Sequence, residues 1–434
     1  MSSLFCDVYE KGMIMTYQEA LDWIHNRPRL GAKPGTERMY RMLDKLGNPQ
    51  NHLKAIHVVG TNGKGSVVNN LQHIFSQAGY QVGTFTSPYI MDFRERISLN
   101  GVMISREDLL VCVNLVKPIV EALAREDDQL QATEFEVITA MMLVYFGRCH
   151  PVDLAIIEAG IGGRDDSTNC FQALAVVCPS IGLDHQNLLG QTLGDIAENK
   201  AAVLKGGEPL IMAVDQSSAR QAFLKRAAAV GSPVYEFGKD FSLTKTADAF
   251  CFSNDSLNIR DINPAMPGRH QVANAALAVQ TASLLQENYP ELSPQAIRAG
   301  LAEAKWLGRT EKLAPNLMID GAHNKESIQA LVDLIKDQYR DKKLHILFAA
   351  IDGKPVASML ASLEKLGSVE VTSFDYPNAM ALQDYPDDYQ QVASFETWFK
   401  EVYQPSQANT LYLVTGSLYF ISQVRQWFLK DWPN

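Results

Sequence analysis

Cysteine is scarce in this 434-residue sequence, and long apolar runs are missing from it. The six cysteines are scattered and form no C-x-x-C pair, which argues against a disulfide framework and against a zinc site. No apolar stretch approaches the roughly 20 residues of a membrane-spanning helix. The first residues carry acids where a secretory signal needs a basic segment followed by an apolar run. We therefore expect a cytoplasmic protein with free thiols and no membrane partner.

Positive charge is also in deficit. The chain has 39 Lys and Arg against 49 Asp and Glu, a formal net charge of -10. Neutralising nucleic-acid phosphates requires clustered Lys and Arg, so no nucleic-acid partner is expected. The composition, 46% hydrophobic and 20% charged, is ordinary for a globular protein. At this length one core is rarely enough, and two domains are expected.

The N-terminal two thirds of the chain alternates short apolar runs with segments of helical periodicity. Such alternation predicts an α/β domain with a mostly parallel sheet covered on both faces. Residues 241–260 break the rhythm and indicate a small antiparallel excursion. The predicted strands are 55–59, 82–85, 154–158, 174–178 and 209–213, and the predicted helices are 66–78, 134–146 and 193–204.

From Asn316 the strand–helix alternation starts again, which predicts a second, smaller Rossmann-like α/β domain. Gly308 breaks the pattern between the two parts, so we place domains at residues 1–305 and 306–434. The predicted strands of the second domain are 317–319, 344–349, 368–372 and 411–414, and its predicted helices are 325–336, 355–366, 394–403 and one from residue 417.

The most informative segment follows the first predicted strand. There an apolar run leads into a glycine-rich turn, a lysine, a serine and a helix. Glycines allow close backbone approach, and the freed N–H groups at a helix N-terminus bind phosphate, with the lysine adding a positive charge. The strict Walker spacing is not met, and an ordinary strand-to-helix turn is the alternative. The segment is Gly60, Thr61, Asn62, Gly63, Lys64, Gly65 and Ser66, and we predict that it binds the phosphates of ATP.

The form GTNGKGS resembles the phosphate loop of the Mur ligase superfamily, and later motifs resemble folylpolyglutamate synthase and dihydrofolate synthase. Each motif is weak alone, but together they run in order from the loop to near the C-terminus. They are Thr86-Ser87-Pro88 with Glu95-Arg96-Ile97, Thr133-x-Phe135-Glu136, Glu158 to Arg164, Asp166-x-Thr168-Asn169, Gly182 to His185, Gln271 to Ala276, Gly308-Arg309, Asp320 to Asn324 and Thr415-Gly416-Ser417.

This resemblance implies an N-terminal P-loop ATPase-type domain, a C-terminal Rossmann-like domain and catalysis between them. It implies a ligase that uses ATP and two Mg²⁺ ions to activate a folate-tail carboxylate as an acyl phosphate. The amine of L-glutamate then attacks that acyl phosphate. Both folate and dihydropteroate are substrates in the family, and the motifs do not distinguish them. A monomer is expected.

The resemblance also implies roles for individual residues. For ATP these are the phosphate loop with Asn274, Arg309 and Asp320, and for the metals Ser87, Glu158, His185 and Lys200, the last as a carbamate. Lys64, His323 and Lys200 are the predicted catalytic residues, and Phe93, Arg96, Asp166 and Ser417 the predicted substrate contacts.

Most of these residues also have a plain structural alternative. Glu158 could cap a nearby loop, His185 could be a satisfied structural histidine, and Ser87 could cap a turn. Asn274 and Ser417 could simply start helices. Lys200 could lie on an exposed helix face. Four positions depart from the family pattern: Tyr89, Asp165, Asn199 and Lys325.

Two other functions stay open at this point. One is a cell-wall Mur-type ligase acting on a UDP-linked substrate, against which the TSP…ERI and DGAHN segments argue. The other is a nucleotide-binding protein without catalytic activity, against which the full set of predicted phosphate and metal residues argues.

Overall fold

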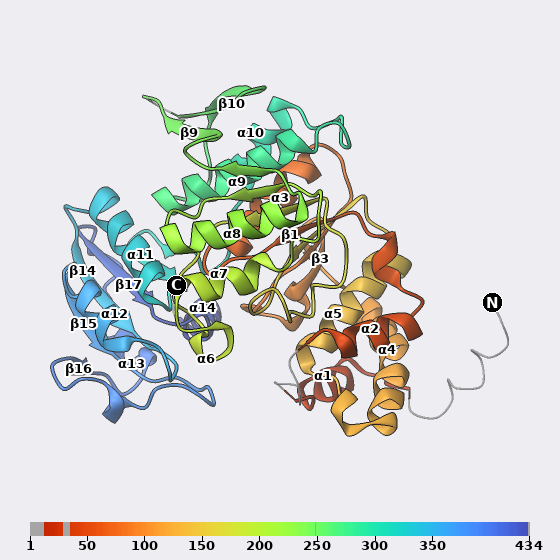
Figure 1. Cartoon of the computed structure of the whole chain (residues 1–434). Coiled ribbons are helices and arrows are strands. Elements are labelled where there is room, and N and C mark those ends of the chain that lie inside the picture. The colour runs from red at the N-terminus through yellow and green to blue at the C-terminus, as the bar shows by residue number, and fades with distance from the viewer. Residues whose placement is uncertain (1–12, 29–34, 248, 433–434) are drawn as a thin grey trace.

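The computed structural model describes residues 13–28, 35–247 and 249–432 (Figure 1). It contains two mostly parallel sheets, one in the N-terminal and one in the C-terminal part, and a small antiparallel sheet between them in sequence. In Figure 1 the C-terminal sheet and its helices lie at the left, beside the larger N-terminal body.

The N-terminal sheet has the strand order β4-β3-β2-β5-β1-β6-β7-β8. All neighbours from β2 to β8 are parallel, and β3 and β4 extend that sheet as an antiparallel edge. Parallel strands are buried on both faces, and accordingly every residue of β1, β2, β5 and β6 is buried. The strands are β1 Ala55–Val58, β2 Val82–Phe85, β3 Ile97–Leu99, β4 Val102–Met103, β5 Leu154–Glu158, β6 Ala175–Cys178, β7 Leu210–Met212 and β8 Val234–Glu236.

Helices cover both faces of this sheet. Ala55 and Val59 belong to the core on one face, while Ile56 and Val58 belong to the core on the other, as the two-residue period of a strand requires. The first core is closed by α1 Tyr17–His25, α2 Glu37–Lys45, α4 Arg106–Glu126, α5 Glu134–Val144, α7 Leu193–Ala201 and α8 Ser217–Val230, and the second by α3 Lys64–Gln77, α9 Arg269–Leu284 and α10 Pro294–Glu303.

Shorter elements complete the N-terminal part. A three-stranded antiparallel sheet packs on the α9 side of the structure and contributes Phe252 to the second core. The short helices are η2 Pro49–His52, η3 Phe93–Arg96, η4 Asp128–Leu130, η5 Tyr145–Cys149 and α6 Gln186–Leu189, and the antiparallel strands are β9 Phe241–Lys245, β10 Phe250–Asn254 and β11 Asn258–Ile262.

The C-terminal sheet has the order β12-β13-β17-β14-β15-β16, parallel except for the edge pair β12 and β13. Helices α11 and α12 close one core and α13 and α14 the other. The elements are β12 Glu311–Ala314, β13 Leu317–Asp320, α11 Lys325–Gln338, β14 Lys343–Phe348, α12 Val356–Leu363, β15 Ser368–Val371, η6 Leu382–Asp384, β16 Gln390–Gln391, α13 Phe395–Glu401, β17 Thr410–Thr415 and α14 Leu418–Asp431.

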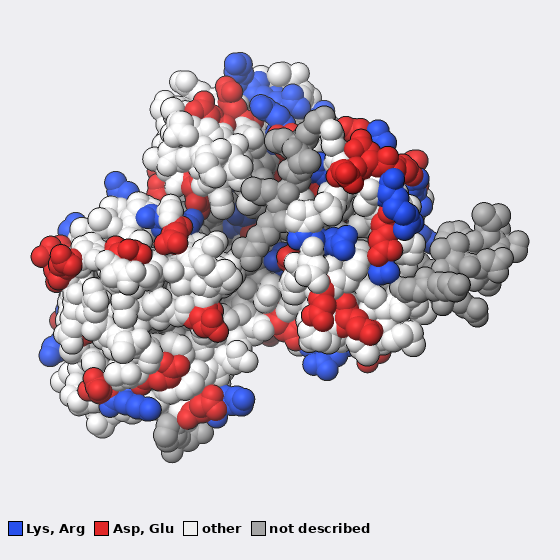
Figure 2. Space-filling view, turned by 90° about the horizontal axis from the view of Figure 1, so that it is seen from below, with Lys and Arg blue, Asp and Glu red and all other residues white. Residues whose placement is uncertain are grey.

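The predicted fold class is therefore confirmed: two successive α/β units, with an antiparallel excursion where the rhythm breaks. Within the described ranges, no helix is long and apolar enough to cross a membrane. On the face seen in Figure 2, acidic and basic side chains are interspersed and do not gather into one broad basic surface.

Candidate active site

The chain direction places three strand ends together in the N-terminal sheet. Strand β1 lies between β5 and β6, and the chain crosses over β1 when it passes from β5 to β6. In open α/β sheets, ligands bind outside the carboxyl ends of the strands at such a reversal of strand order. The phosphate loop follows β1, Glu158 ends β5, and Pro179 and Ser180 follow β6.

The glycines of the phosphate loop meet a conformational need. Gly60 has φ 145° and Gly63 has φ 88°, both in the range that disfavours side chains. A Cβ on Gly63 would lie 2.7 Å from Asn274 Oδ1, and one on Gly60 would lie 3.0 Å from the Ser180 carbonyl oxygen. Thr61 N donates to that same carbonyl oxygen at 2.8 Å, which ties the loop to the segment after β6. The loop is therefore a tight turn at the start of α3.

Two lysine ammonium groups meet at one atom of this loop. The Gly60 carbonyl oxygen accepts from Lys64 Nζ at 3.2 Å and from Lys200 Nζ at 2.9 Å. Lys200 is only 5% exposed, so its alternative as a residue on an exposed helix face is wrong. Burial, assisted by the Lys64 charge, lowers the pKa of Lys200 to about 7. A substantial share of this amine is therefore neutral near neutral pH.

Glu158 supplies the carboxylate of this site. It is buried at the end of β5, with Oε1 3.7 Å from Lys64 Nζ and Oε2 accepting from the Ser87 backbone N–H at 3.4 Å. Burial raises the pKa of Glu158 above its usual range, while Lys64 opposes that effect. Glu158 thus joins the loop that carries Ser87 to the loop that carries Lys64.

The first two turns of helix α9 lie against the phosphate loop. The N-cap of α9 is Gly268, so Asn274 lies inside the helix and its alternative role as a helix cap is wrong. Asn274 Nδ2 donates to Gln271 Oε1 at 3.0 Å, and Gln271 Nε2 donates to Ser66 Oγ at 3.2 Å. Because α3 begins at Lys64, Ser66 is already helical, buried and held by this amide chain.

The C-terminal part contributes Asp320 from the end of β13. Its Oδ2 accepts from the Thr310 N–H at 2.8 Å, and its Oδ1 accepts from the Ala322 N–H at 2.9 Å. Burial raises the pKa of Asp320, and the Arg309 guanidinium opposes that effect. These bonds hold both Asp320 and the segment around Arg309 at the edge of the same cavity.

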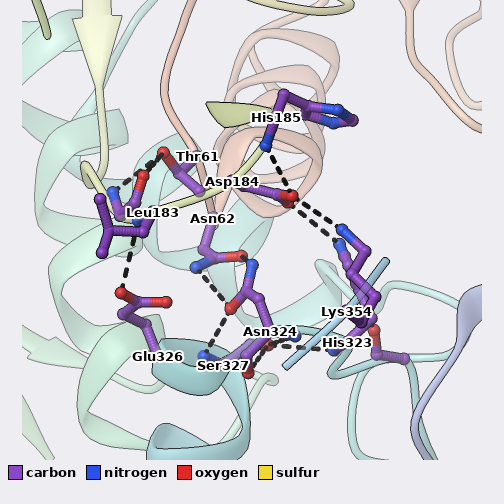
Figure 3. A network of polar contacts seen from close by, with 12 residues as sticks. Thr61, Asn62, Leu183, Asp184, His185, His323, Asn324, Glu326, Ser327 and Lys354 are labelled. Carbon is purple, nitrogen blue, oxygen red and sulfur yellow. Dashed lines mark hydrogen bonds and ion pairs between the residues drawn. The ribbon is translucent and has the colours of Figure 1, made fainter. Parts of the chain in front are cut away.

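Figure 3 shows polar contacts that join the two parts across this site. Asn62 and Asn324 exchange reciprocal amide bonds of 3.2 and 2.9 Å, so the phosphate loop touches the start of α11 directly. Asp184 Oδ1 accepts from Lys354 Nζ at 2.7 Å. Burial alone would raise the pKa of Asp184, but Lys354 outweighs it and the pKa falls to about 2.

His323 lies beside the Asp184–Lys354 ion pair. Its Nδ1 lies 2.9 Å from the Gly321 carbonyl oxygen, which requires the proton on Nδ1 and leaves Nε2 as the acceptor. Nε2 is 3.9 Å from Asp184 Oδ2. Burial and the Lys354 charge lower the pKa of His323 to about 4, so the ring is neutral at pH 7. His185 N donates to Asp184 Oδ1 at 3.0 Å, which places His185 beside this cluster.

A cavity of about 1190 Å³ collects these groups from both sheets. Of the predicted site residues, all of which the structure describes, only Phe93 and Ser417 do not line it. Its walls include residues 60–66, Ser87, Arg96, Glu158, Asp166, His185, Lys200, Asn274, Arg309, Asp320 and His323.

Phe93 lies behind the wall of the cavity, and Asp166 is part of that wall. Phe93 is buried, with its ring 5.7 Å below the Arg96 guanidinium, so Arg96 reaches the cavity and Phe93 supports it. The Arg96 Nε is buried without a hydrogen-bond acceptor, although its NH2 lies 3.9 Å from Glu134. Asp166 accepts from the backbone N–H groups of Ile161 and Thr168 at 2.8 and 2.9 Å, which fixes the glycine-rich segment after β5.

Ser417 is a buried residue at the start of α14, and its hydroxyl makes no capping bond. The plain capping role expected as the alternative is therefore not observed. The next two residues, Leu418 and Tyr419, line the cavity.

Sequence reasoning gave no role to Lys354, Asp184, Asn324 or Glu326. Lys354 sits in a loop after β14, where a lysine after Asp-Gly is a weak signal. Asn324 caps α11 and Glu326 follows it, and each meets a partner more than 100 residues away in sequence. Such partners emerge only when the two sheets are placed side by side.

Comparisons with known proteins agree with this arrangement. Residues 308–418 match the family described as "Mur ligase, glutamate ligase domain". The chain is 39% identical over 430 residues to a dihydrofolate synthase/folylpolyglutamate synthase of Bacillus subtilis (strain 168), covering 95% of this chain and 99% of that protein. It is 35% identical over 431 residues to a folylpolyglutamate synthase of Lacticaseibacillus casei, covering 96% and 99%.

A solved structure described as an FPGS–AMPPCP–folate complex superposes with a TM-score of 0.84 at 33% identity. It covers 96% of this chain and all of the other. The match spans both sheets and the cavity between them.

Proposed function

Because the chain belongs to the folylpolyglutamate synthase/dihydrofolate synthase family, we propose that it is an ATP-dependent ligase that adds L-glutamate to the glutamate tail of folate. The reaction activates the tail carboxylate as an acyl phosphate, which the glutamate amine attacks. ATP use is supported by the AMPPCP present in a homologous structure.

One observation carries this proposal. A glycine-rich loop at a helix N-terminus, two lysines and a buried carboxylate converge in a cavity that a second α/β sheet completes. A carboxylate oxygen becomes a leaving group only when the carboxylate is converted to an acyl phosphate, so such a ligase must hold a nucleotide and a carboxylate together and exclude water. A cavity walled by both sheets meets that need.

The residues divide this work. The N–H groups of residues 63–66, at the start of α3, and the Lys64 ammonium receive phosphate oxygens. Arg309 and Asp320 face the same cavity from the second sheet, where a guanidinium suits phosphate and a carboxylate suits ribose hydroxyls. The Arg96 guanidinium lines the cavity, where it suits a substrate carboxylate.

The resemblance implies magnesium, and the chemistry of the residues fits it. Within the described residues no three His, Cys, Asp or Glu side chains form a ready metal cluster. Mg²⁺ commonly takes one or two protein carboxylates together with phosphate oxygens and water, so Glu158 with Ser87 suits one ion. His185 and a carbamate on Lys200 are the proposed ligands of a second. When bound, the ions neutralise phosphate charge and polarise the transferred phosphoryl group.

The proposal also covers the oligomeric state, the cellular location and a second activity. A monomer is expected, and a cytoplasmic location suits the five described cysteines, which are all free thiols. Addition of glutamate to dihydropteroate is a second candidate activity, since the relative at 39% identity carries both names.

ADP release by the purified protein tests the proposal. Tetrahydrofolate and dihydropteroate are each supplied with and without glutamate. Release that requires both glutamate and tetrahydrofolate is expected, and release with dihydropteroate reports the second activity. Turnover only with a UDP-muramoyl peptide, or none with any acceptor, would contradict the assignment.

A further inference from the structure

Away from the cavity, two cysteines meet on neighbouring helices. Cys112 is buried on α4, and Cys149 is half-buried at the end of η5, the π-helical turn that continues α5. The two thiols lie close enough that each shifts the pKa of the other. They lie 37 positions apart in the chain, so the fold alone brings them together.

Polar groups surround this thiol pair on one side. One turn before Cys112, Asp108 accepts from His150 Nε2 at 3.2 Å and from the Tyr145 hydroxyl at 3.5 Å. The Tyr145 and His150 rings lie 4.9 Å apart. Asp108 and Cys112 on one helix therefore face Tyr145, Cys149 and His150 on the other, at the i, i+4 spacing that puts side chains on one face.

The environment favours reaction at Cys149. The neighbouring Cys112 thiol lowers the pKa of Cys149 to about 7, against the opposing effect of burial, and the His150 and Arg148 charges assist. Burial and the same contact raise the pKa of Cys112. A thiol with a pKa near ambient pH is the better nucleophile for disulfide exchange, so Cys149 is the attacking thiol and Cys112 is the neighbouring thiol that can resolve the mixed disulfide.

We infer that Cys112 and Cys149 form a reversible modification site, which a low-molecular-weight disulfide such as oxidised glutathione converts into an intramolecular disulfide. The Cys149 thiolate attacks one glutathione sulfur, forms a mixed disulfide and releases a glutathione thiolate. Cys112 then attacks Cys149 Sγ, and the second glutathione thiolate leaves with the proton that Cys112 loses. Two protein thiols are oxidised and one glutathione disulfide is reduced to two thiols.

Cys112 and Cys149 differ from the other described cysteines because each lies beside a second thiol. Cys170 and Cys178 are buried, and burial raises the pKa of each to about 12. Cys251 is half-buried and contacts Asn258 Oδ1 at 3.7 Å. Cys251 is thus a matched control, a partly exposed thiol for which the described part of the chain shows no second thiol that could resolve a mixed disulfide.

Exchange followed by peptide mapping tests the inference. The reduced full-length protein is incubated with oxidised glutathione at pH 8, free thiols are alkylated, and the product is digested with trypsin. The expected product joins the peptides 107–125 and 149–164, which carry Cys112 and Cys149. A reductant should separate them. Cys251 should yield only a glutathione adduct.

Two variants keep the result interpretable. Cys112→Ala should leave a stable glutathione adduct on Cys149, and Cys149→Ser should abolish both the adduct and the linkage while leaving the circular dichroism spectrum unchanged. A persistent Cys149 adduct in the unsubstituted protein, or alkylation of both thiols after exposure to oxidised glutathione, would overturn the inference.

Discussion

At the scale of single residues, the Gly60 carbonyl oxygen is the meeting point of the site. It accepts from both Lys64, within the phosphate loop, and Lys200, on α7. Two ammonium groups at one carbonyl repel each other, which makes loss of charge on the more buried one favourable. Lys200 is therefore the residue open to modification.

Replacement of Lys64 tests the loop assignment. Lys64→Ala removes the cation that faces the transferred phosphates, so kcat at saturating ATP should fall about 10²- to 10³-fold or more. The fold should persist, because Lys64 bonds only to carbonyl oxygens of its own loop and to Glu158. Steady-state kinetics measures kcat, and thermal unfolding shows whether the fold persists. Replacement of the exposed Lys54 by alanine is the control. Near-native kcat would rule out this role.

Lys200 should carry a carbamate. Its amine is buried and next to the phosphate loop, where an anionic oxygen ligand suits Mg²⁺ better than an ammonium. Protein prepared in ¹³C-labelled bicarbonate should show one carbamate carbon signal that is missing from Lys200→Ala. That variant should lose activity and regain part of it with short carboxylic acids, which Lys64→Ala should not. An unmodified Lys200 in fully active protein would refute the assignment.

At the scale of secondary structure elements, the sequence predicted most of what positions the site. Strands 82–85 and 154–158 match β2 and β5 in full, and the predicted helix 193–204 begins as α7 does, where Thr192 and Asp195 form a capping box. The helix that carries Lys64 begins two residues earlier than predicted, because Gly63 in the left-handed region serves as its N-cap. Apolar periodicity marks where a helix packs, but not which glycine starts it.

The start of α14 carries a prediction of its own. Ser417 occupies the N-cap position without making a capping bond, beside cavity-lining residues. We predict that it binds the incoming glutamate, whose carboxylate the positive helix end would favour. Ser417→Ala should then raise the KM for glutamate several-fold more than the KM for ATP, with little change in Tm.

Ser293→Ala is the matched control for this experiment. Ser293 caps α10 by accepting from the Ala296 N–H at 3.2 Å. Its loss should lower stability by about 1 kcal/mol without shifting either KM. If Ser417→Ala behaves like Ser293→Ala, the glutamate assignment fails.

At the scale of the whole molecule, the site depends on two sheets that the sequence could only predict separately. The family motifs named Asp320 and His323, and alternation predicted the sheet that carries them. The partners Asn62–Asn324 and Asp184–Lys354 lie 262 and 170 positions apart, and no local pattern encodes such pairs. The boundary at residues 305 and 306 stays a prediction, and limited proteolysis between α10 and β12 would test it.

The Asp184–Lys354 ion pair should hold the N-terminal and C-terminal α/β units in the relative orientation that the active site requires. Both side chains are mostly buried, 15% and 12% exposed, so removing one leaves the other charged and poorly solvated. Lys354→Met should therefore lower kcat/KM about 10- to 100-fold. In the double variant with Asp184→Asn, the losses should fall well short of additive, because both changes break one interaction. The exposed pair Lys45–Glu126 is the control, where Lys45→Met should have no effect on turnover. Fully additive losses would mean that Asp184 and Lys354 act independently, and the ion pair would then have no role in joining the two sheets.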